Sequence, residues 1–395
     1  MTETNPILTH VREALSTVID PEIRRPITDL GMVDDLTIDD AGIVHLTVLL
    51  TIAGCPMRNT IEEDVTNAVH KVPGVTGIDL QIDAMNEQQR AELTEKLRGG
   101  RPAPVIQFAQ PESRTRVVAV ASGKGGVGKS SMTVNLALAL AKQGFSVGLL
   151  DADIYGHSIP DLLGIPEDAR PTMVDSMIMP VPVEYVTADG KKATLRVISM
   201  GMLKESRDQV IAWRGPILDR AITQLLAEVF WGDLDFFLID LPPGTGDVAM
   251  SIGQKLPGSD MIVVTTPQTS VSWVSERAGT MGSMLHQNVI GVIENMSWFE
   301  TTCPNCNEAH RIEFFGSGGG QQTADALSDR VAREVPLLGQ IPMEYALGAG
   351  AEINAPIVVA HPDSPAALAI AEIAQHLVDT KASLVGKPLG LKVNS

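Results

Sequence analysis

With 395 residues, of which 44% are hydrophobic, the chain is long enough to bury a large core and to form more than one domain. Its formal net charge of −18 disfavours broad contact with nucleic acid or anionic lipid, because such contact depends on clustered lysine and arginine. The three cysteines lack the spacing of a disulfide framework, and the sequence shows neither a leader pattern nor a long apolar span. We therefore expect a globular cytoplasmic protein with reduced thiols, and neither nucleic acid nor membrane among its partners.

Residues 1–97 predict a small α/β domain that is large enough to fold alone. Apolar residues recur at helical spacing near the N-terminus, and β-rich runs separated by turn residues follow. The predicted elements are a helix at 7–19, strands at 32–38 and 43–51, a helix at 57–70, a strand at 75–83 and a helix at 86–98. The Gly- and Pro-rich stretch at 98–114 then interrupts the periodicity and predicts a linker.

Residues 115–380 alternate strand, glycine-rich turn and helix, and 381–395 form a C-terminal tail. The predicted strands are 117–122, 145–151, 236–242, 261–267, 289–295 and 336–342. Because these strands are continuously apolar, they predict a mainly parallel sheet that is covered by helices on both faces. The fold class is therefore α/β, a P-loop NTPase domain preceded by the smaller domain.

The stretch GKGGVGKS follows the first of these strands and opens a helix, which is the context that a P-loop requires. Its backbone N–H groups and the helix N-terminus suit phosphate binding. We expect Lys129 to contact the β- and γ-phosphates of ATP and the Ser130 hydroxyl to bind Mg²⁺. The predicted nucleotide-binding residues of this segment are Gly123, Lys124, Gly125, Gly126, Val127, Gly128, Lys129, Ser130 and Ser131.

Lys124 is an additional lysine at the second position of the loop. The sequence KGGVGKS resembles the deviant Walker A motif of the SIMIBI-type ATPases, a class that includes MinD, ParA and nitrogenase iron protein. This resemblance implies a homodimer in which Lys124 reaches the nucleotide of the partner chain and takes part in catalysis.

Acidic residues follow two further strands, at the edge of the sheet where a γ-phosphate would lie. In DADIYGHS, Asp153 is the candidate that orients the attacking water, and Asp151 is a candidate for indirect contact with Mg²⁺. In DLPPGTGD, Asp240 is the expected Walker B carboxylate, and Gly244 is expected to offer its N–H to the γ-phosphate.

The pair Cys303 and Cys306 in CPNC has several interpretations. A thioredoxin-like redox pair is disfavoured, because that motif opens a helix whereas this pair lies in a polar insertion between a strand and a helix. The only other ligand candidates close by are Glu308 and His310, and we expect His310 to be a polar loop residue. A twofold dimer supplies four thiolates, which suit a [4Fe–4S] cluster or Zn²⁺. The spacing alone also allows an inert pair.

Six motifs in one order resemble the Mrp/ApbC family of iron–sulfur cluster carrier ATPases over residues 115–380. They are GKGGVGKSS, DADIYGHSIP, WRGPIL, IDLPPGTGD, GVIENMS and CPNC. The resemblance implies ATP hydrolysis, a homodimer, and a labile [4Fe–4S] cluster that Cys303 and Cys306 hold between protomers. It also implies transfer of the cluster to recipient apoproteins, contact with assembly factors, and an adenine contact by Asn295.

The first domain carries DPE at 20–22, DLGMV at 29–33 and TIAGCP at 51–56. These motifs resemble the small domain associated with SUF-type and cytosolic iron–sulfur assembly factors. Cys55 is then either a reactive or cluster-contacting thiol or a small buried residue near a turn.

Two other functions compete with cluster transfer. One is a positioning or partition ATPase like MinD or ParA, which the acidic charge and the helix-breaking residues Gly386, Pro388 and Gly390 of the tail disfavour. The other is an ATPase with a purely structural zinc site at the CxxC pair.

Overall fold

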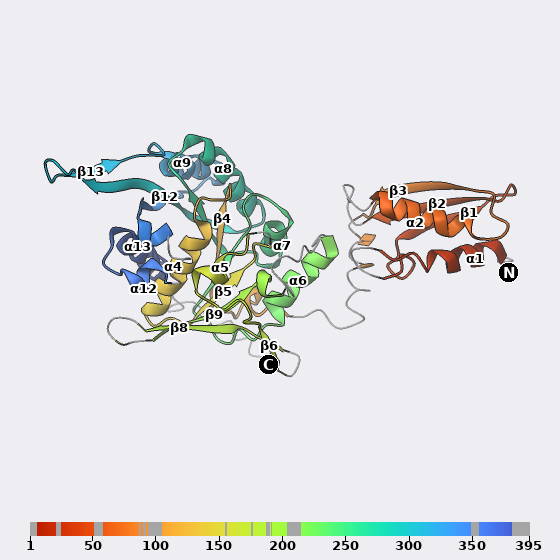
Figure 1. Ribbon diagram of the computed structural model, residues 1–395, viewed down its shortest axis with the longest axis horizontal. Coiled ribbons are helices and arrows are strands. Elements are labelled where there is room, and N and C mark those ends of the chain that lie inside the picture. The colour runs from red at the N-terminus through yellow and green to blue at the C-terminus, as the bar shows by residue number, and fades with distance from the viewer. Residues whose placement is uncertain are drawn as a thin grey trace, which may run out of the picture. The chain divides into compact units, whose positions relative to one another are not determined.

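The structure is a computed structural model in which contacts divide the chain into two compact units (Figure 1). One unit comprises Met1–Pro104 with Val210–Ala221, and the other comprises Val105–Gln209 with Ile222–Ser395. The structure describes residues 6–20, 25–50, 58–86, 88–89, 92–93, 105–154, 156–174, 177–186, 190, 192–203, 215–348 and 355–380.

The first unit is a three-stranded sheet with two helices. Its elements are α1 (Pro6–Leu15), β1 (Val33–Ile38), β2 (Ile43–Leu50), α2 (Arg58–His70) and β3 (Gly77–Ala84). β2 lies in the centre, antiparallel to β1 and parallel to β3. Its alternate residues Val44, Leu46 and Val48 are buried in one core with Leu15 of α1 and Val65 of α2, as the period of two along a strand requires.

Several expectations for this unit fall outside the described residues. They concern residues 21–22 of the DPE motif, the motif at 51–56 with Cys55, and most of the helix expected at 86–98. The described helices and strands agree with the predicted ones to within a few residues, and the predicted hairpin is the antiparallel pair β1–β2.

The second unit contains a large mixed sheet. Its strands are β4 (Arg116–Ser122), β5 (Val147–Asp151), β8 (Val181–Val186), β9 (Lys192–Ser199), β10 (Phe236–Asp240), β11 (Asp260–Thr265), β12 (Asn288–Thr302), β13 (Ala309–Ile312) and β14 (Leu337–Met343). Their order is β13-β12-β11-β4-β10-β5-β9-β8, and β14 also pairs with β12. A small separate hairpin joins β6 (Thr172–Val174) and β7 (Met177–Met179).

Helices cover both faces of the large sheet. They are α4 (Lys129–Lys142), α5 (Ile159–Leu162), α7 (Asp247–Lys255), α8 (Thr269–Met284), α9 (Gly319–Val331), α10 (Tyr345–Gly348), α12 (Ile357–Ala360) and α13 (Pro365–Asp379), and α6 (Gly215–Ala227) is divided between the two units. In β11, Ile262 and Val264 share a core with residues of α4 and α13, whereas Val263 lies against Gly279 of α8. The predicted α/β P-loop fold with a mainly parallel sheet is confirmed.

The sheet is larger than the sequence predicted, because three of its strands were missed, the edge strands β8 and β13 and the inner strand β9. β8 alternates between exposed and half-buried residues, and β13 is exposed along its whole length, so neither has the continuous apolar run by which the inner strands were identified. Both run antiparallel to their neighbours. The third, β9, lies between β5 and β8. β12 also continues to Thr302, seven residues beyond the predicted end at 295.

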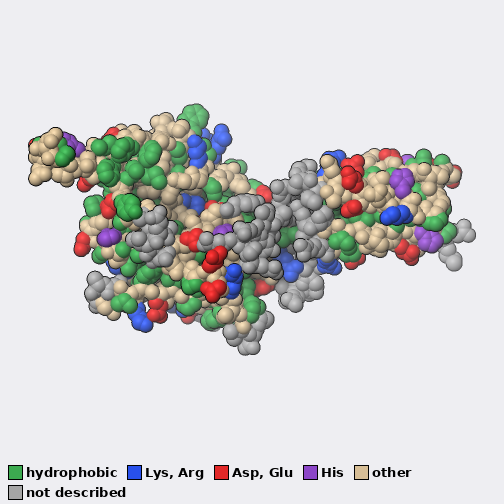
Figure 2. Space-filling model, in the orientation of Figure 1, with side chains coloured by type: hydrophobic (Ala, Val, Ile, Leu, Met, Phe, Trp, Pro, Cys, Tyr) green, Lys and Arg blue, Asp and Glu red, His purple; other side chains and the backbone are tan. Residues whose placement is uncertain are grey.

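Among the described residues, no helix has the length and apolar character needed to cross a membrane. On the face shown in Figure 2, lysine and arginine side chains are scattered among acidic ones rather than gathered into one surface.

Candidate functional site

The predicted phosphate loop joins β4 to α4 at the centre of the sheet. Gly128 ends the loop with φ +83°, a left-handed conformation that side chains rarely adopt. At Gly123, a Cβ would collide with backbone atoms of Val274 and Ser275 in α8. The loop therefore needs glycine at one position for its conformation and at another for its packing. Because α4 is buried on most of its surface, its N-terminus is held firmly beside the loop.

The first residues of α4 meet the end of β10 in a buried network. The ammonium of Lys129 lies 2.7 Å from Oδ2 of Asp240, and the two side chains are 6% and 0% exposed. The Ser130 hydroxyl donates to the same oxygen at 2.6 Å, and the Thr133 hydroxyl donates to Oδ1 at 2.8 Å. Hydroxyl and carboxylate oxygens are the ligands that Mg²⁺ prefers, so Ser130 and Asp240 fit the predicted magnesium site.

Asp151 ends the neighbouring strand, in register with Asp240. It accepts a hydrogen bond from the Ser199 hydroxyl at 2.8 Å and one from the backbone N–H of Asp153 at 3.2 Å. Burial, together with the nearby charge of Asp240, raises the pKa of Asp151 to about 7. Asp153 is also buried, and its Oδ1 accepts from the N–H of Gly156 at 2.9 Å.

The raised pKa of Asp151 predicts a pH dependence of stability. Between about pH 4 and pH 7, the folded state keeps a proton that the unfolded state releases, so the free energy of unfolding falls as the pH rises through this window. Asp151→Asn cannot ionise, and its free energy of unfolding should rise relative to wild type over the same window. A pKa shift of three units corresponds to a change of at most about 4 kcal/mol in the free energy of unfolding. Urea titrations of both proteins from pH 4 to pH 8 check this prediction. If the free energies of unfolding of the two proteins changed in parallel with pH, the prediction would be contradicted.

Two other predicted nucleotide contacts are engaged with the protein itself. The N–H of Gly244 donates to the carbonyl of Ser122 at 2.8 Å, so its expected bond to a γ-phosphate requires that this bond opens. The Asn295 amide donates to the carbonyl of Val127 at 2.9 Å, and its Oδ1 is buried without a hydrogen-bond partner among the described residues. Asn295 thus lies against the phosphate loop, and its adenine contact stays a prediction.

The remaining predicted residues of the loop differ in exposure. Lys124 is exposed, as are Gly125 and Gly126, whereas Val127 is buried. The carbonyl of Lys124 accepts a hydrogen bond from the Ser122 hydroxyl at 3.0 Å, and the carbonyl of Ser131 accepts one from the Asn135 amide at 2.8 Å.

The sequence interpretation missed two residues of this network, Thr133 and Ser199. Thr133 lies four residues after Lys129, and this spacing places the two on one face of a helix, so it was recognisable in principle. Ser199 lies at the end of β9, a strand that was not predicted.

The cysteine pair lies at the end of a hairpin, and this hairpin forms the expected polar insertion between the strand predicted at 289–295 and the next helix, α9. β12 runs on past its partner β14 and turns back as β13, and this hairpin projects from the domain (Figure 1). The turn is closed by hydrogen bonds from the N–H of Cys303 to the carbonyl of Glu308 and from the N–H of Asn307 to the carbonyl of Cys303, both 2.9 Å long.

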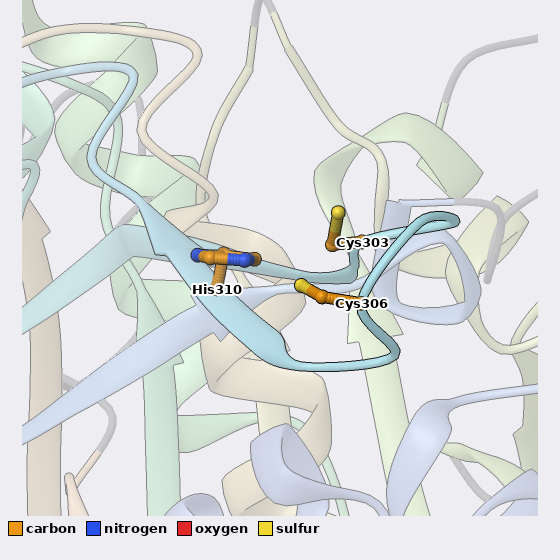
Figure 3. Close-up of side chains that lie close together, drawn as sticks. All are labelled: Cys303, Cys306 and His310. Atoms are coloured by element: carbon orange, nitrogen blue, oxygen red, sulfur yellow. The ribbon is translucent and has the colours of Figure 1, made fainter.

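Figure 3 shows Cys303, Cys306 and His310 gathered at this end of the hairpin. Their ligand atoms lie within 4.8 Å of one another; Cys303 is partly exposed and the other two are exposed. The backbone N–H groups of Cys306 and Asn305, together with the Cys306 side chain, hold the pKa of the Cys303 thiol below its ordinary value. The thiolate is the form that binds metals. His310, which was expected to be a polar loop residue, instead belongs to β13.

Side chains on the two strands and just after β13 contact one another across the hairpin. The Arg311 guanidinium lies 4.2 Å from the centre of the Trp298 ring and forms an ion pair with Glu300 at 3.1 Å. The Phe299 and Phe314 rings are 6.1 Å apart. Such cross-strand pairs favour a single register, and the positions of the thiols depend on that register.

Comparisons with known proteins cover both units. A family model described as NUBPL iron-transfer P-loop NTPase matches residues 113–378, and one described as iron-sulfur cluster assembly protein matches residues 8–80. The iron-sulfur cluster carrier protein of Mycobacterium bovis is 49% identical over 381 residues, which cover 96% of each chain. That of Synechocystis is 38% identical over 378 residues, which cover 95% of this chain and 97% of the relative. A solved nucleotide-binding protein from Archaeoglobus fulgidus in complex with ADP is 33% identical, with a TM-score of 0.49, and the match covers 63% of this chain and 89% of that one.

Proposed function

Because the chain belongs to the iron–sulfur cluster carrier family of P-loop NTPases, we propose that it holds a [4Fe–4S] cluster between two copies of itself and passes it to recipient apoproteins. ATP binding and hydrolysis change the geometry of the dimer and thereby the retention of the cluster. The recipients are apoproteins that need such a cluster, and assembly factors supply it.

The observation that carries this proposal is the pair of accessible thiols at the end of the hairpin. Cys303 and Cys306 provide two thiolates, whereas a [4Fe–4S] cluster takes about four. A twofold axis beside the hairpin brings the same pair from a second chain and completes the set. A cluster held at such an exposed place remains accessible to the thiolates of an acceptor, which suits a carrier better than a permanent cofactor.

The nucleotide site supplies the second part of the proposal. Bound Mg²⁺ would neutralise phosphate charge during hydrolysis. In this chain, Ser130 and Asp240 hold the ion, Lys129 moves from Asp240 to the phosphates, and Asp153 orients the attacking water. Asp151, in register with Asp240, is in place for indirect contact with the ion, and its carboxylate accepts a hydrogen bond from the N–H of Asp153.

A transfer assay tests the proposed function. The protein is reconstituted anaerobically with iron and sulfide, freed of excess reagents, and mixed with an apo-dehydratase that requires a [4Fe–4S] cluster. We expect about four iron and four sulfide ions per two chains. We also expect enzyme activity to return in the presence of a chelator that traps free iron. If enzyme activity returned no faster than with equal amounts of free iron and sulfide, cluster transfer by this protein would be contradicted.

We expect that replacing the exposed Lys124 lowers ATP hydrolysis and that a partner chain with an intact Lys124 restores it. Lys124→Ala should hydrolyse ATP at least about tenfold more slowly, because a cation that neutralises transition-state charge is lost, while nucleotide affinity changes little. The matched control is Lys192→Ala, which removes an exposed lysine paired with Glu184; it should hydrolyse ATP at the wild-type rate.

Mixing two variants that are each impaired in hydrolysis shows whether Lys124 acts across the dimer. In an equal mixture of Lys124→Ala and Lys129→Ala chains, half of the dimers are mixed, and each contains one complete site. The mixture should therefore recover roughly a quarter of the wild-type rate, if the chains pair at random. A mixture no more active than its separate components would exclude the action of Lys124 on the partner's nucleotide.

A further inference from the structure

The position of His310 is not explained by a cluster that four thiolates hold. Its ring lies with the sulfurs of Cys303 and Cys306 in one group of potential ligands (Figure 3). A dimer supplies four cysteines without any histidine, so the function proposed above leaves this imidazole without a role.

The register of the hairpin places His310 there. His310 pairs with Thr301, and Cys303 is the second residue after Thr301. Alternate residues of a strand point to the same face, so His310 and Cys303 share one face of the hairpin. A slip of one residue would turn the imidazole to the other face. The bonds that close the turn, including that from the N–H of Cys303 to the carbonyl of Glu308, preserve this register.

The three side chains are suitable ligands for a thiophilic divalent ion. Two thiolates and an imidazole are a common zinc ligand set, with metal distances of about 2.3 Å to sulfur and about 2.0 Å to nitrogen. Tetrahedral geometry then brings the ligand atoms to about 3.5–3.8 Å from one another. Their present separations of up to 4.8 Å therefore close by about 1 Å, which rotation of exposed side chains achieves.

A fourth ligand is also at hand. Oε2 of Glu308 lies 3.7 Å from the sulfur of Cys306, so its carboxylate or a water molecule completes a tetrahedron. Magnesium and calcium are disfavoured, because both take oxygen ligands.

We propose that Cys303, Cys306 and His310 of a single chain form a site for one thiophilic divalent ion, with Zn²⁺ as the ion that best fits these ligands. The site does not need a second chain. The ion and the cluster exclude each other, because both use the same thiolates. This mutual exclusion rests on the function proposed above.

Cobalt titration of the full-length protein tests the site. The protein is reduced, stripped with a chelator under anaerobic conditions, and titrated with Co²⁺. Thiolate-to-metal charge transfer and the visible bands of tetrahedral Co²⁺ should saturate at one ion per chain, and Zn²⁺ should then displace the cobalt. Saturation at one ion per two chains, or no tetrahedral bands, would overturn the proposal.

Variants assign the ligands. His310→Ala should weaken Co²⁺ binding about tenfold or more and shift its visible bands. His376→Ala is the matched control, because it removes another exposed histidine of the same domain from α13. It should bind Co²⁺ as wild type does. Equal affinity in the His310→Ala and wild-type proteins would overturn the assignment.

Cluster reconstitution separates this proposal from the proposed function. His310→Ala should take up as much iron and sulfide as wild type, and wild type loaded with Zn²⁺ should take up little. Full cluster uptake by the zinc-loaded protein would overturn the mutual exclusion. If neither the His310→Ala protein nor zinc-free wild type takes up a cluster, the carrier function is contradicted. The cobalt titration still decides whether the metal site exists.

Discussion

Replacement of Lys129 by alanine should lower ATP hydrolysis by about 100-fold or more, because it removes a buried cation from the phosphate site. In the structure this ammonium pairs with Asp240 at 2.7 Å. The lysine therefore lies beside the carboxylate that we propose as the Walker B residue. Steady-state hydrolysis at saturating ATP and Mg²⁺ measures the effect.

The variant should also be less stable. Without the ammonium, the carboxylate of Asp240 is left buried next to Asp151, and an unpaired buried charge costs about 3 kcal/mol. Lys129→Arg separates the two effects, because it keeps a cation. It should recover part of the stability while the rate stays low, since a guanidinium does not reproduce the geometry of the ammonium. A folded Lys129→Ala protein with wild-type hydrolysis would contradict the assignment of this lysine.

The double variant Cys303→Ser/Cys306→Ser should lose the reconstituted cluster altogether. Serine hydroxyls are poor ligands for iron–sulfur clusters, and both thiolates of each chain disappear at once. The cysteines lie in an exposed turn outside the core, so the fold and ATP hydrolysis should persist. Iron and sulfide analysis after anaerobic reconstitution, with the visible spectrum, measures the loss.

Cys55→Ser is the control, because it removes the remaining cysteine of the chain. This variant should retain iron and sulfide at the wild-type level if the hairpin alone holds the cluster. Iron and sulfide retained by the double variant but lost from Cys55→Ser would move the cluster site to the first domain and contradict the proposal for the hairpin.

Much of the fold was predictable, because its inner strands are recognisable locally. β4, β5, β10 and β11 are continuous apolar runs, and strands of a sheet buried on both faces typically have such runs. β8 and β13 lack this pattern, because an edge strand is exposed on at least one side. Missing β9 also hid Ser199, whose hydroxyl donates to Asp151.

The phosphate loop was predictable for a similar reason. Its glycines meet local requirements of conformation and packing, as Gly128 and Gly123 show. The glycine spacing and the lysine–serine pair that follows therefore identify the loop without knowledge of distant residues.

By itself, the sequence determined the P-loop, the pair of thiols and most of the parallel strands of the large sheet, because each depends on residues close together in sequence. Only the tertiary structure decided that Asp240 meets Ser130, 110 positions away, and that burial beside Asp240 raises the pKa of Asp151. It also decided that His310 stands with the two cysteines. These contacts depend on strand order and register, which arise from packing between distant segments and not from local pattern.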